Sequence, residues 1–339
     1  MYKNLLIIAL TGCCSLVVQR SFAQQDPQFS MNFHNKLFVN PAYAGMNDAI
    51  CVYGISRQQW VGYEGRPESY VFGVHGTFTV PYINLRSGGG LSILSDGLGQ
   101  MRFFGLKGIY SAHIPLNFIS GQPGHLGVGV SFGLLQFSMG SNWRSFDSPF
   151  IDPIIPDQGF SANKFDMDFG LFYQTEGPQN LYFGISSTHL NAAKFIGEGV
   201  TAPPLGQNVP WKTTFRMTQH YYIIAGYNYP LPSNTMFVLK PSLFAKTEAV
   251  SAQIDLNMTV EWNGFAWGGL TYRYTDAVVV MGGLNWSPPK GTIKFGYAYD
   301  ITTSAIATGS NGSHELFLQY CLKLKKPAPV QKHKSVRFL

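Results

Sequence analysis

Apolar and polar residues alternate with a period of two along most of the chain. The clearest segment runs from Ser251 to Trp262, where every second residue from Ala252 through Leu256 to Trp262 is apolar and the residues between are polar. Successive side chains of a β-strand point to opposite sides, so this segment predicts a strand with one apolar and one polar face. In a transmembrane barrel the apolar face would contact lipid and the polar face would line the lumen.

Similar alternation, interrupted by turn residues, predicts fourteen strands, and bacterial outer-membrane barrels have an even number. They are expected near residues 49–60, 69–80, 88–95, 102–115, 125–139, 165–174, 180–188, 219–230, 236–246, 251–262, 265–274, 277–286, 291–300 and 314–322. Small residues crowd one face of several strands, which indicates a filled or narrow lumen. The expected fold class is all-β, a transmembrane antiparallel β-barrel of about 14 strands.

The lengths of the connections support this interpretation. If the chain enters the first strand from the periplasm, the even-numbered connections are periplasmic and should be short. From the sixth strand onward they are short and rich in turn residues, namely Thr175–Gln179, Leu231–Thr235, Asn263–Gly264 and Ser287–Lys290. The odd-numbered connections include the long segments Gly140–Lys164, Leu190–Thr218 and Ile301–Ser313. Two earlier connections, Pro81–Arg86 and Leu116–Gly124, fit this asymmetry less well.

Composition excludes two other classes of protein. Only 12% of the 339 residues are charged, and 45% are hydrophobic, so the chain is too apolar to be intrinsically disordered. After the first 23 residues no apolar run approaches the roughly 18 residues that a spanning helix needs. A closed barrel is the other backbone arrangement that can cross lipid.

The first 23 residues are typical of a secretory signal, with Lys3, an apolar stretch and a small-residue cleavage site at Ala23. An uncleaved membrane anchor is one alternative, and lipidation of Cys13 after a shorter signal is another. Cleavage at Ala23 would leave Cys51 and Cys321, which have no metal-ligand spacing. One disulfide between them is possible but is not indicated by the sequence.

The positive charge of the chain is concentrated at its C-terminus. Residues 323–339 hold six cations and no acids, whereas residues 24–322 hold 16 cations and 18 acids. The basic character therefore belongs to the tail and does not indicate that the body binds nucleic acid. Four regions are expected: a signal peptide (1–23), an N-terminal periplasmic or luminal segment (24–47), the barrel (48–322) and a basic periplasmic tail (323–339).

Five stretches resemble the PorP/SprF family of outer-membrane proteins, which belong to the type IX secretion and gliding machinery of Bacteroidota. In order they are Gln25–Ser30, Leu37–Gly45, Arg57–Gly62 with Pro67 and Val74–Gly76, Gly90–Ser92 with Ser95–Gly99, and Gly312–Leu316. The most specific is Asn-Pro-Ala-Tyr-Ala-Gly at residues 40–45, and the matches extend to residue 320. Family members commonly stop at an aromatic residue that closes the last strand, whereas this chain continues for 17 residues past Leu322.

The resemblance implies a barrel that works beside the translocon, helping cargo such as a large adhesin to be exported or held on the cell surface. It implies periplasmic and outer-membrane secretion components and outer-membrane lipid as partners. Candidate contact residues on the matched stretches are Asn40, Pro41, Ala42, Tyr43, Gly45, Trp60, His75, His314 and Glu315. The Asn40–Gly45 stretch is interpreted either as a plug or docking element or as a simple turn set by Pro41 and Gly45.

No residue set points to catalysis, a cofactor or a metal. The histidines, including His189, His220 and His314, have no second ligand at helical or hairpin spacing. Several aspartates of the Gly140–Lys164 segment could bind Ca²⁺, but their spacing matches no EF-hand loop. Aromatic residues near strand ends are expected to form interfacial girdles, and Trp143 and Trp211 in the long loops are candidate cargo contacts.

The sequence therefore predicts a non-enzymatic outer-membrane component of type IX secretion that helps export or anchor a cell-surface protein. Two alternatives are a passive or hydrophobic-solute channel and a purely structural barrel. The expected location is the outer membrane, after removal of the signal peptide.

Overall fold

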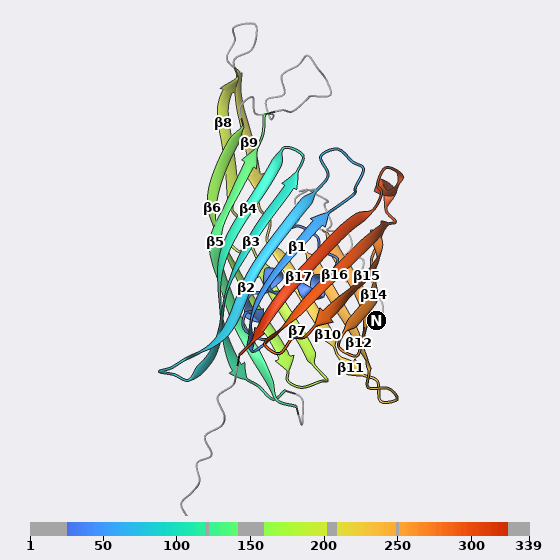
Figure 1. Cartoon of the computed structure of the whole chain (residues 1–339). Coiled ribbons are helices and arrows are strands. Elements are labelled where there is room, and N and C mark those ends of the chain that lie inside the picture. Colours follow the sequence, from blue (N-terminus) through green and yellow to red (C-terminus); the bar gives the residue numbers. More distant parts are fainter. Residues whose placement is uncertain (1–25, 119–121, 142–158, 202–208, 249–250, 325–339) are drawn as a thin grey trace, which may run out of the picture.

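We describe a computed structural model in which residues 26–118, 122–141, 159–201, 209–248 and 251–324 are placed (Figure 1). The strands are β1 (Ala49–Gln58), β2 (Glu68–Val80), β3 (Leu85–Leu98), β4 (Met101–Pro115), β5 (Gly124–Met139), β6 (Phe160–Thr175), β7 (Leu181–Thr188), β8 (Lys194–Thr201), β9 (Val209–Arg216), β10 (His220–Tyr227), β11 (Tyr229–Pro230), β12 (Phe237–Thr247), β13 (Ala252–Trp262), β14 (Ala266–Arg273), β15 (Ala277–Trp286), β16 (Gly291–Thr302) and β17 (Ser313–Lys323). The short helices are η1 (Asn32–His34), α2 (Lys36–Val39), η2 (Pro41–Tyr43) and η3 (Ala305–Thr308).

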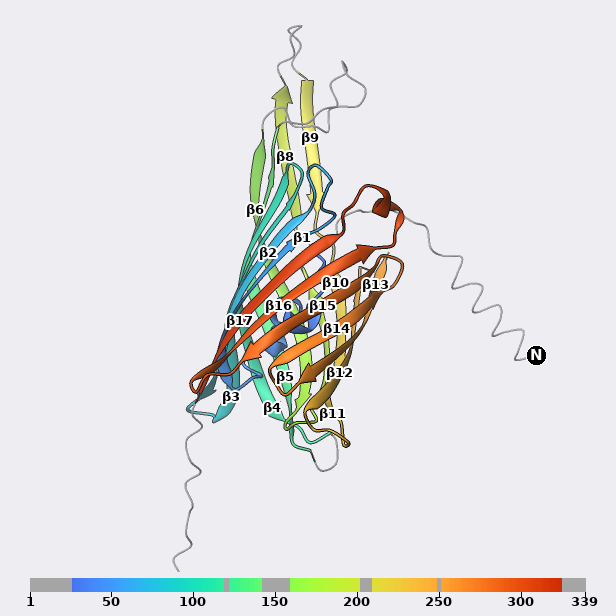
Figure 2. The ribbon, with the colours of Figure 1, turned by 45° about the vertical axis from the view of Figure 1, so that its right-hand side comes forward.

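Fourteen antiparallel strands close into a barrel (Figures 1 and 2). Neighbours in sequence pair around the ring, β10 pairs with both β7 and β12, and β1 pairs with β17 to complete the closure. The predicted all-β barrel and its strand number are confirmed. No helix in the placed part of the chain is long and apolar enough to cross a membrane.

The two faces of the strands have the predicted chemistry. On β13, Leu256 points outward and is 55% exposed, whereas its neighbour Asn257 points into the lumen and is 6% exposed. Outward apolar residues recur around the ring, including Leu270 on β14 and Leu318 on β17. This apolar outer surface is what a bilayer requires.

The two ends of the barrel differ in the way the sequence predicts. One end, here called the short-turn end, carries the β6–β7, β13–β14 and β15–β16 turns, and the other, which carries the β5–β6 and β7–β10 connections, is called the long-loop end. The predicted connection Leu190–Thr218 is not a plain loop, because it contains the separate β8–β9 hairpin. Phe195 and Phe215 of this hairpin pack on Phe137 of β5, which extends beyond the neighbouring strands together with β6 (Figures 1 and 2).

A disulfide joins the two strands that close the ring. Cys51 of β1 and Cys321 of β17 lie directly opposite each other in the ladder and are covalently linked. The sequence did not indicate this bond, because the register between the first and last strands depends on closure of the whole barrel.

The residues from Asp26 to Asn47, called the plug segment below, lie inside the ring of strands (Figure 1). Phe29, Met31 and Leu37 of this segment are buried in one apolar cluster with inward residues such as Trp267 and Phe317. The plug segment runs from the long-loop half of the lumen, where Asp26 lies, to the start of β1 at the short-turn end.

Candidate functional site

Glycines on the inner wall allow the Asn40–Gly45 stretch to approach the barrel backbone closely. A Cβ atom added at Gly129 of β5 would lie 2.2 Å from the Ala42 nitrogen, and one at Gly170 of β6 would lie 2.2 Å from the Asn40 Oδ1. The stretch begins at Asn40, whose Oδ1 accepts a hydrogen bond from the Ala42 N–H at 3.0 Å and so caps η2. Gly45 has a φ of +75°, a conformation that glycine adopts without strain.

Polar groups of the wall bind the backbone of this stretch. The Ser111 hydroxyl donates to the Ala42 carbonyl at 3.0 Å, and His113 Nε2 donates to the Ala44 carbonyl at 2.8 Å. The Gly45 N–H donates to His75 Nδ1 at 3.1 Å. These bonds satisfy backbone groups that water cannot reach.

Two side chains of the stretch also contact the wall. Asn40 Nδ2 donates to the Leu171 carbonyl of β6 at 3.0 Å and to the Ile185 carbonyl of β7 at 3.2 Å. The Tyr43 ring packs edge-on against Phe172 with a centroid separation of 5.2 Å, and it also contacts His75. The stretch is therefore a docked part of the plug segment.

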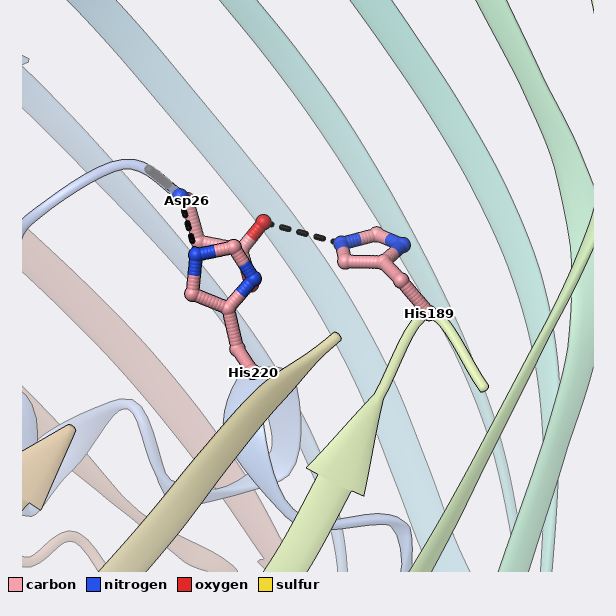
Figure 3. A group of neighbouring side chains, drawn as sticks. All are labelled: Asp26, His189 and His220. Carbon is pink, nitrogen blue, oxygen red and sulfur yellow. Dashed lines mark hydrogen bonds and ion pairs between the residues drawn. The ribbon is translucent and has the colours of Figure 1, made fainter. Parts of the chain in front are cut away.

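The start of the plug segment is held by a second, charged set of contacts, here called the Asp26 latch (Asp26, His189 and His220; Figure 3). Asp26 Oδ1 accepts from His189 Nε2 at 2.8 Å, and the Asp26 N–H donates to His220 Nε2 at 3.2 Å. Asp26 Oδ2 also accepts from the Tyr222 hydroxyl at 2.6 Å, and the Asp26 carbonyl accepts from Lys246 Nζ at 2.9 Å. The latch thus ties the plug segment to the ends of three barrel strands.

The latch carries opposite charges. Burial alone would raise the pKa of Asp26, but the neighbouring His189 and His220 hold it well below its usual value. Burial alone would lower the pKa of His189, but the charge of Asp26 and hydrogen bonds to Asp166 and Asp26 raise it to about 10. Asp26 is therefore ionised and His189 protonated at neutral pH.

A third set of contacts joins the plug segment to β1, β14, β16 and β17. Glu315 accepts from the backbone N–H groups of Ser30 at 2.7 Å and Met31 at 2.8 Å. Arg57 bonds Asp300 at 2.8 Å and Glu315 at 3.2 Å. The side chains of Arg57, Asp300 and Glu315 are buried. Because Glu315 shares the Arg57 guanidinium with Asp300, the backbone N–H groups of Ser30 and Met31 supply the further donors that this buried carboxylate needs.

Arg273 extends this buried network. Its guanidinium contacts Asp255 at 3.2 Å and Asp300 at 2.9 Å, and its Nη2 donates to the Phe29 carbonyl of the plug segment at 3.3 Å. Arg57, Arg273 and Asp300 were not among the candidate contact residues predicted from the sequence. Each of these residues is a charged residue at an inward-facing position of a strand that is otherwise mainly apolar, and this pattern could have identified them from the sequence.

The structure brings together some of the predicted contact residues and separates others. Within residues 40–45, Tyr43 and Gly45 contact His75, whereas Asn40 and Ala42 bond to other strands of the wall. Glu315 holds the other part of the plug segment. His314 instead faces outward, where its Nδ1 lies 2.7 Å from the Tyr297 hydroxyl.

Two of the three tryptophan candidates are among the described residues, and both lie away from the plug segment. Trp60 follows β1 at the long-loop end, and its backbone N–H donates to the Ser313 hydroxyl at 3.1 Å. Trp211 is in β9, opposite Gly199 in the hairpin ladder. Trp143 lies outside the described residues, as do the predicted signal peptide and residues 325–339.

Side chains of types that can ligate a metal come together at the latch, although the sequence spacing did not reveal this. The ligand atoms of Asp26, His189 and His220 lie within 4.8 Å of one another, as do those of Asp166, Asp168 and His189. Each of these side chains already has a hydrogen-bond partner, and Lys107 Nζ contacts Asp166 at 2.7 Å and Asp168 at 2.8 Å. The arrangement is that of a paired charge network which fixes the plug segment.

Comparison with known proteins gives a family and a fold. Residues 21–320 match the family described as type IX secretion system membrane protein PorP/SprF, which confirms the resemblance found in the sequence. No curated protein matches the chain. A solved structure of the CymD monoaromatic hydrocarbon channel superposes with a TM-score of 0.52 at 13% identity, covering 86% of this chain and 93% of that one. The Ralstonia pickettii toluene transporter TbuX gives 0.50 at 12% identity, covering 85% and 93%. At these identities the likeness concerns the fold alone.

Proposed function

The chain belongs to the PorP/SprF family of type IX secretion membrane proteins, and from this membership we propose that it is a non-enzymatic outer-membrane component that helps export a cell-surface protein or holds it on the surface. The observation that carries the proposal is the filled lumen. The plug segment is docked on the wall and bound by buried ion pairs, so a polypeptide has no path through this barrel. The protein therefore acts beside a separate translocon, and its contacts with cargo are made at its ends.

The long-loop end is the proposed cargo side. Outer-membrane barrels place short turns in the periplasm and long loops outside, so the short-turn end would face the periplasm. The β8–β9 hairpin and the extended β5 and β6 then project from the cell surface (Figure 2). An adhesin of the type the family resemblance implies would meet this hairpin, and secretion components would meet the short-turn end.

A hydrophobic-solute channel remains the second candidate, because the two structural neighbours carry titles of hydrocarbon channel and toluene transporter. The charges in the lumen argue against it. Sites for apolar solutes are lined mainly by apolar side chains, whereas Arg57, Arg273 and Asp300 are buried inside this lumen, toward its long-loop end. A solute would have to displace the plug segment and cross this network.

Comparison of surface proteins tests the proposal. Intact cells lacking the protein, and the same cells complemented with the full chain or with a variant lacking residues 196–214, would be labelled with a membrane-impermeant biotin reagent. We expect one large surface protein to be lost in the deletion strain and restored by the full chain. The hairpin variant should fold, as judged by heat-modifiable gel mobility, and should fail to restore that protein.

Two outcomes would contradict the proposal. If the labelled surface proteins are the same in all strains, the protein does not serve a surface cargo. If in addition the purified barrel carries a steady single-channel current, the channel candidate is correct, because a docked plug segment should block such a current.

A further inference from the structure

The plug segment leaves one large cavity at the short-turn end of the barrel, called the basic cup below. Its volume is about 630 Å³, within the range typical of ligand-binding pockets. It is lined by residues of the plug segment such as Lys36 and Tyr43, by inward residues such as Lys240 and Lys294, and by turn residues such as Asn180. The turn residues place its mouth at the short-turn end.

Positive charge in the basic cup exceeds negative charge. Five lysines and arginines line it, against two acids. The two acids are already paired, Asp48 with Arg86 at 2.6 Å and Glu176 with His125 at 2.8 Å. Lys240 is paired with Glu261 at 2.7 Å, just outside the lining.

Lys36 and Lys294 have no ion-pair partner among the described residues. Lys36 Nζ lies 3.4 Å from the ring centroid of Tyr182 and 5.5 Å from that of Tyr43. A cation–π contact holds the ammonium but leaves its N–H groups without a strong acceptor. Burial, together with the charges of Lys294 and Lys240, lowers the pKa of Lys36 to about 7. A buried cation among other cations is costly, and an anion in the cup would offset that cost.

We propose that the basic cup binds a carboxylate-bearing segment of another polypeptide, which enters from the short-turn end. The neutral polar lining supports a peptide occupant, because Asn180, Asn228 and Gln319 can pair with peptide backbone groups while Lys36 and Lys294 bind acidic side chains or a chain terminus. The tyrosine faces add apolar contact.

Other occupants fit less well. The cup lies inside the ring of strands, so the lipid around the barrel does not reach it. Lys323 already lines the cup, and the chain's own residues 324–339 that follow it carry five more cations and no acids, so like charge opposes their entry. A single small inorganic anion would leave most of the 630 Å³ unfilled. Only the assignment of this end to the periplasm is taken from the proposed function.

Peptide binding to the purified full-length barrel in detergent tests the proposal. Fluorescent eight-residue peptides with four glutamates, or with four glutamines in their place, would be titrated and followed by anisotropy. The glutamate peptide should bind at least about tenfold more tightly, since bonds to charged groups are worth more than a factor of ten in affinity. Binding should weaken as salt rises.

Two lysine variants distinguish binding in the cup from nonspecific electrostatic attraction of the peptide to a basic protein. Lys294→Gln should weaken binding of the glutamate peptide about tenfold. The matched control is Lys290→Gln, which changes an exposed lysine of the adjoining β15–β16 turn that does not line the cup. It should change the affinity less than about twofold. Both variants should keep heat-modifiable mobility, because Lys294→Gln removes a cation from a crowded group of cations.

Three outcomes would overturn the proposal. Equal binding of the glutamate and glutamine peptides would show that charge is not recognised. Equal weakening by Lys290→Gln and Lys294→Gln would place the binding outside the cup. Competition by inorganic phosphate as strong as by the peptide would show a small-anion site. The surface-labelling experiment can contradict the proposed function while the glutamate peptide still binds the cup, and peptide binding can be absent while the surface protein is still lost in the deletion strain. The two proposals are therefore tested separately.

Discussion

Gly129→Ala should release the Asn40–Gly45 stretch from the wall without unfolding the barrel. The added Cβ would lie 2.2 Å from the Ala42 nitrogen and 2.4 Å from its Cα, where all the nearest atoms are backbone. Relief of this overlap requires the stretch to move by about 1 Å, since carbon contacts are favourable only near 3.5–4.0 Å. The strand itself should not suffer, because alanine in a strand interior is better tolerated than glycine.

The structure sets the size of the effect. A retreat of about 1 Å takes three hydrogen bonds beyond bonding distance, those from Ser111 and His113 to the plug carbonyls and that from Gly45 to His75. Each contributes about 0.5–1.5 kcal/mol net. Docking of the stretch should therefore weaken by about 1.5–4.5 kcal/mol, which corresponds to roughly a ten- to two-thousand-fold rise in the open population.

Hydrogen exchange followed by mass spectrometry measures that population. In the purified barrel, peptides covering residues 36–48 should exchange faster by that factor, because protection reports the free energy of local opening. Peptides from β12 to β16 should be unchanged. Gly108→Ala on β4 is the control, since its nearest neighbouring atom, the Phe132 carbonyl oxygen, would be 3.8 Å away. Unchanged protection in Gly129→Ala, or the same loss in Gly108→Ala, would refute close docking on the glycine wall.

Four further outcomes are expected. Leu256→Arg places a charge on the lipid side of β13 and should cost about 2–4 kcal/mol of stability, whereas Thr292→Glu, which places a charge among the cations of the basic cup, should cost much less; folded fractions from heat-modifiable mobility check this, and equal costs would contradict the assignment of faces. Cys51→Ser should lower the thermal midpoint, because a disulfide typically contributes about 2–4 kcal/mol; a reducing agent should lower the wild type equally and leave the variant unchanged. The raised pKa of His189, about 10, means that its stabilisation is complete below about pH 6.5 and is lost as pH rises through 10, so the thermal midpoint should fall over this range in the wild type more than in His189→Gln. Deleting residues 325–339 should leave folding intact; if the tail contacts an acidic periplasmic surface, the deletion should abolish salt-sensitive recovery of periplasmic partners, and unchanged recovery would disprove that contact.

The strands could be predicted because their pattern is local. Alternation over about ten residues decides which side of a strand meets lipid, and each of the fourteen barrel strands lies where the alternation indicated. The local signal failed at the extension of β6 back to Phe160 and at the β8–β9 hairpin. Both project beyond the main ring and pack on each other through Phe160, Phe195 and Phe215, so their strands are not required to present an apolar face to lipid.

The contacts within the lumen could not be predicted, because they join residues far apart in sequence. His189 and His220 are 163 and 194 residues from Asp26, and neither neighbours a second ligand at helical or hairpin spacing. The Cys51–Cys321 bond has the same origin, since the two residues become opposite only when the last strand returns to the first. The sequence did show that small residues crowd one face of the strands. Only the structure shows that glycines on this face make room for the Asn40–Gly45 stretch.

Apolar residues on the inner wall explain why the plug segment should remain in place. A water-filled channel needs a polar lining, but Ile55, Val279 and Phe317 point inward and are buried against the plug segment. Phe29 and Met31 fill this region, and burying such side chains contributes about 1.5–3 kcal/mol each. Full release of the plug segment would expose these groups and unpair the Asp26 latch together, whereas local opening at Asn40–Gly45 would not. A ligand that contacts only Lys36 and Tyr43 can therefore bias the Asn40–Gly45 stretch while the barrel stays closed, as the proposed role beside a separate translocon requires.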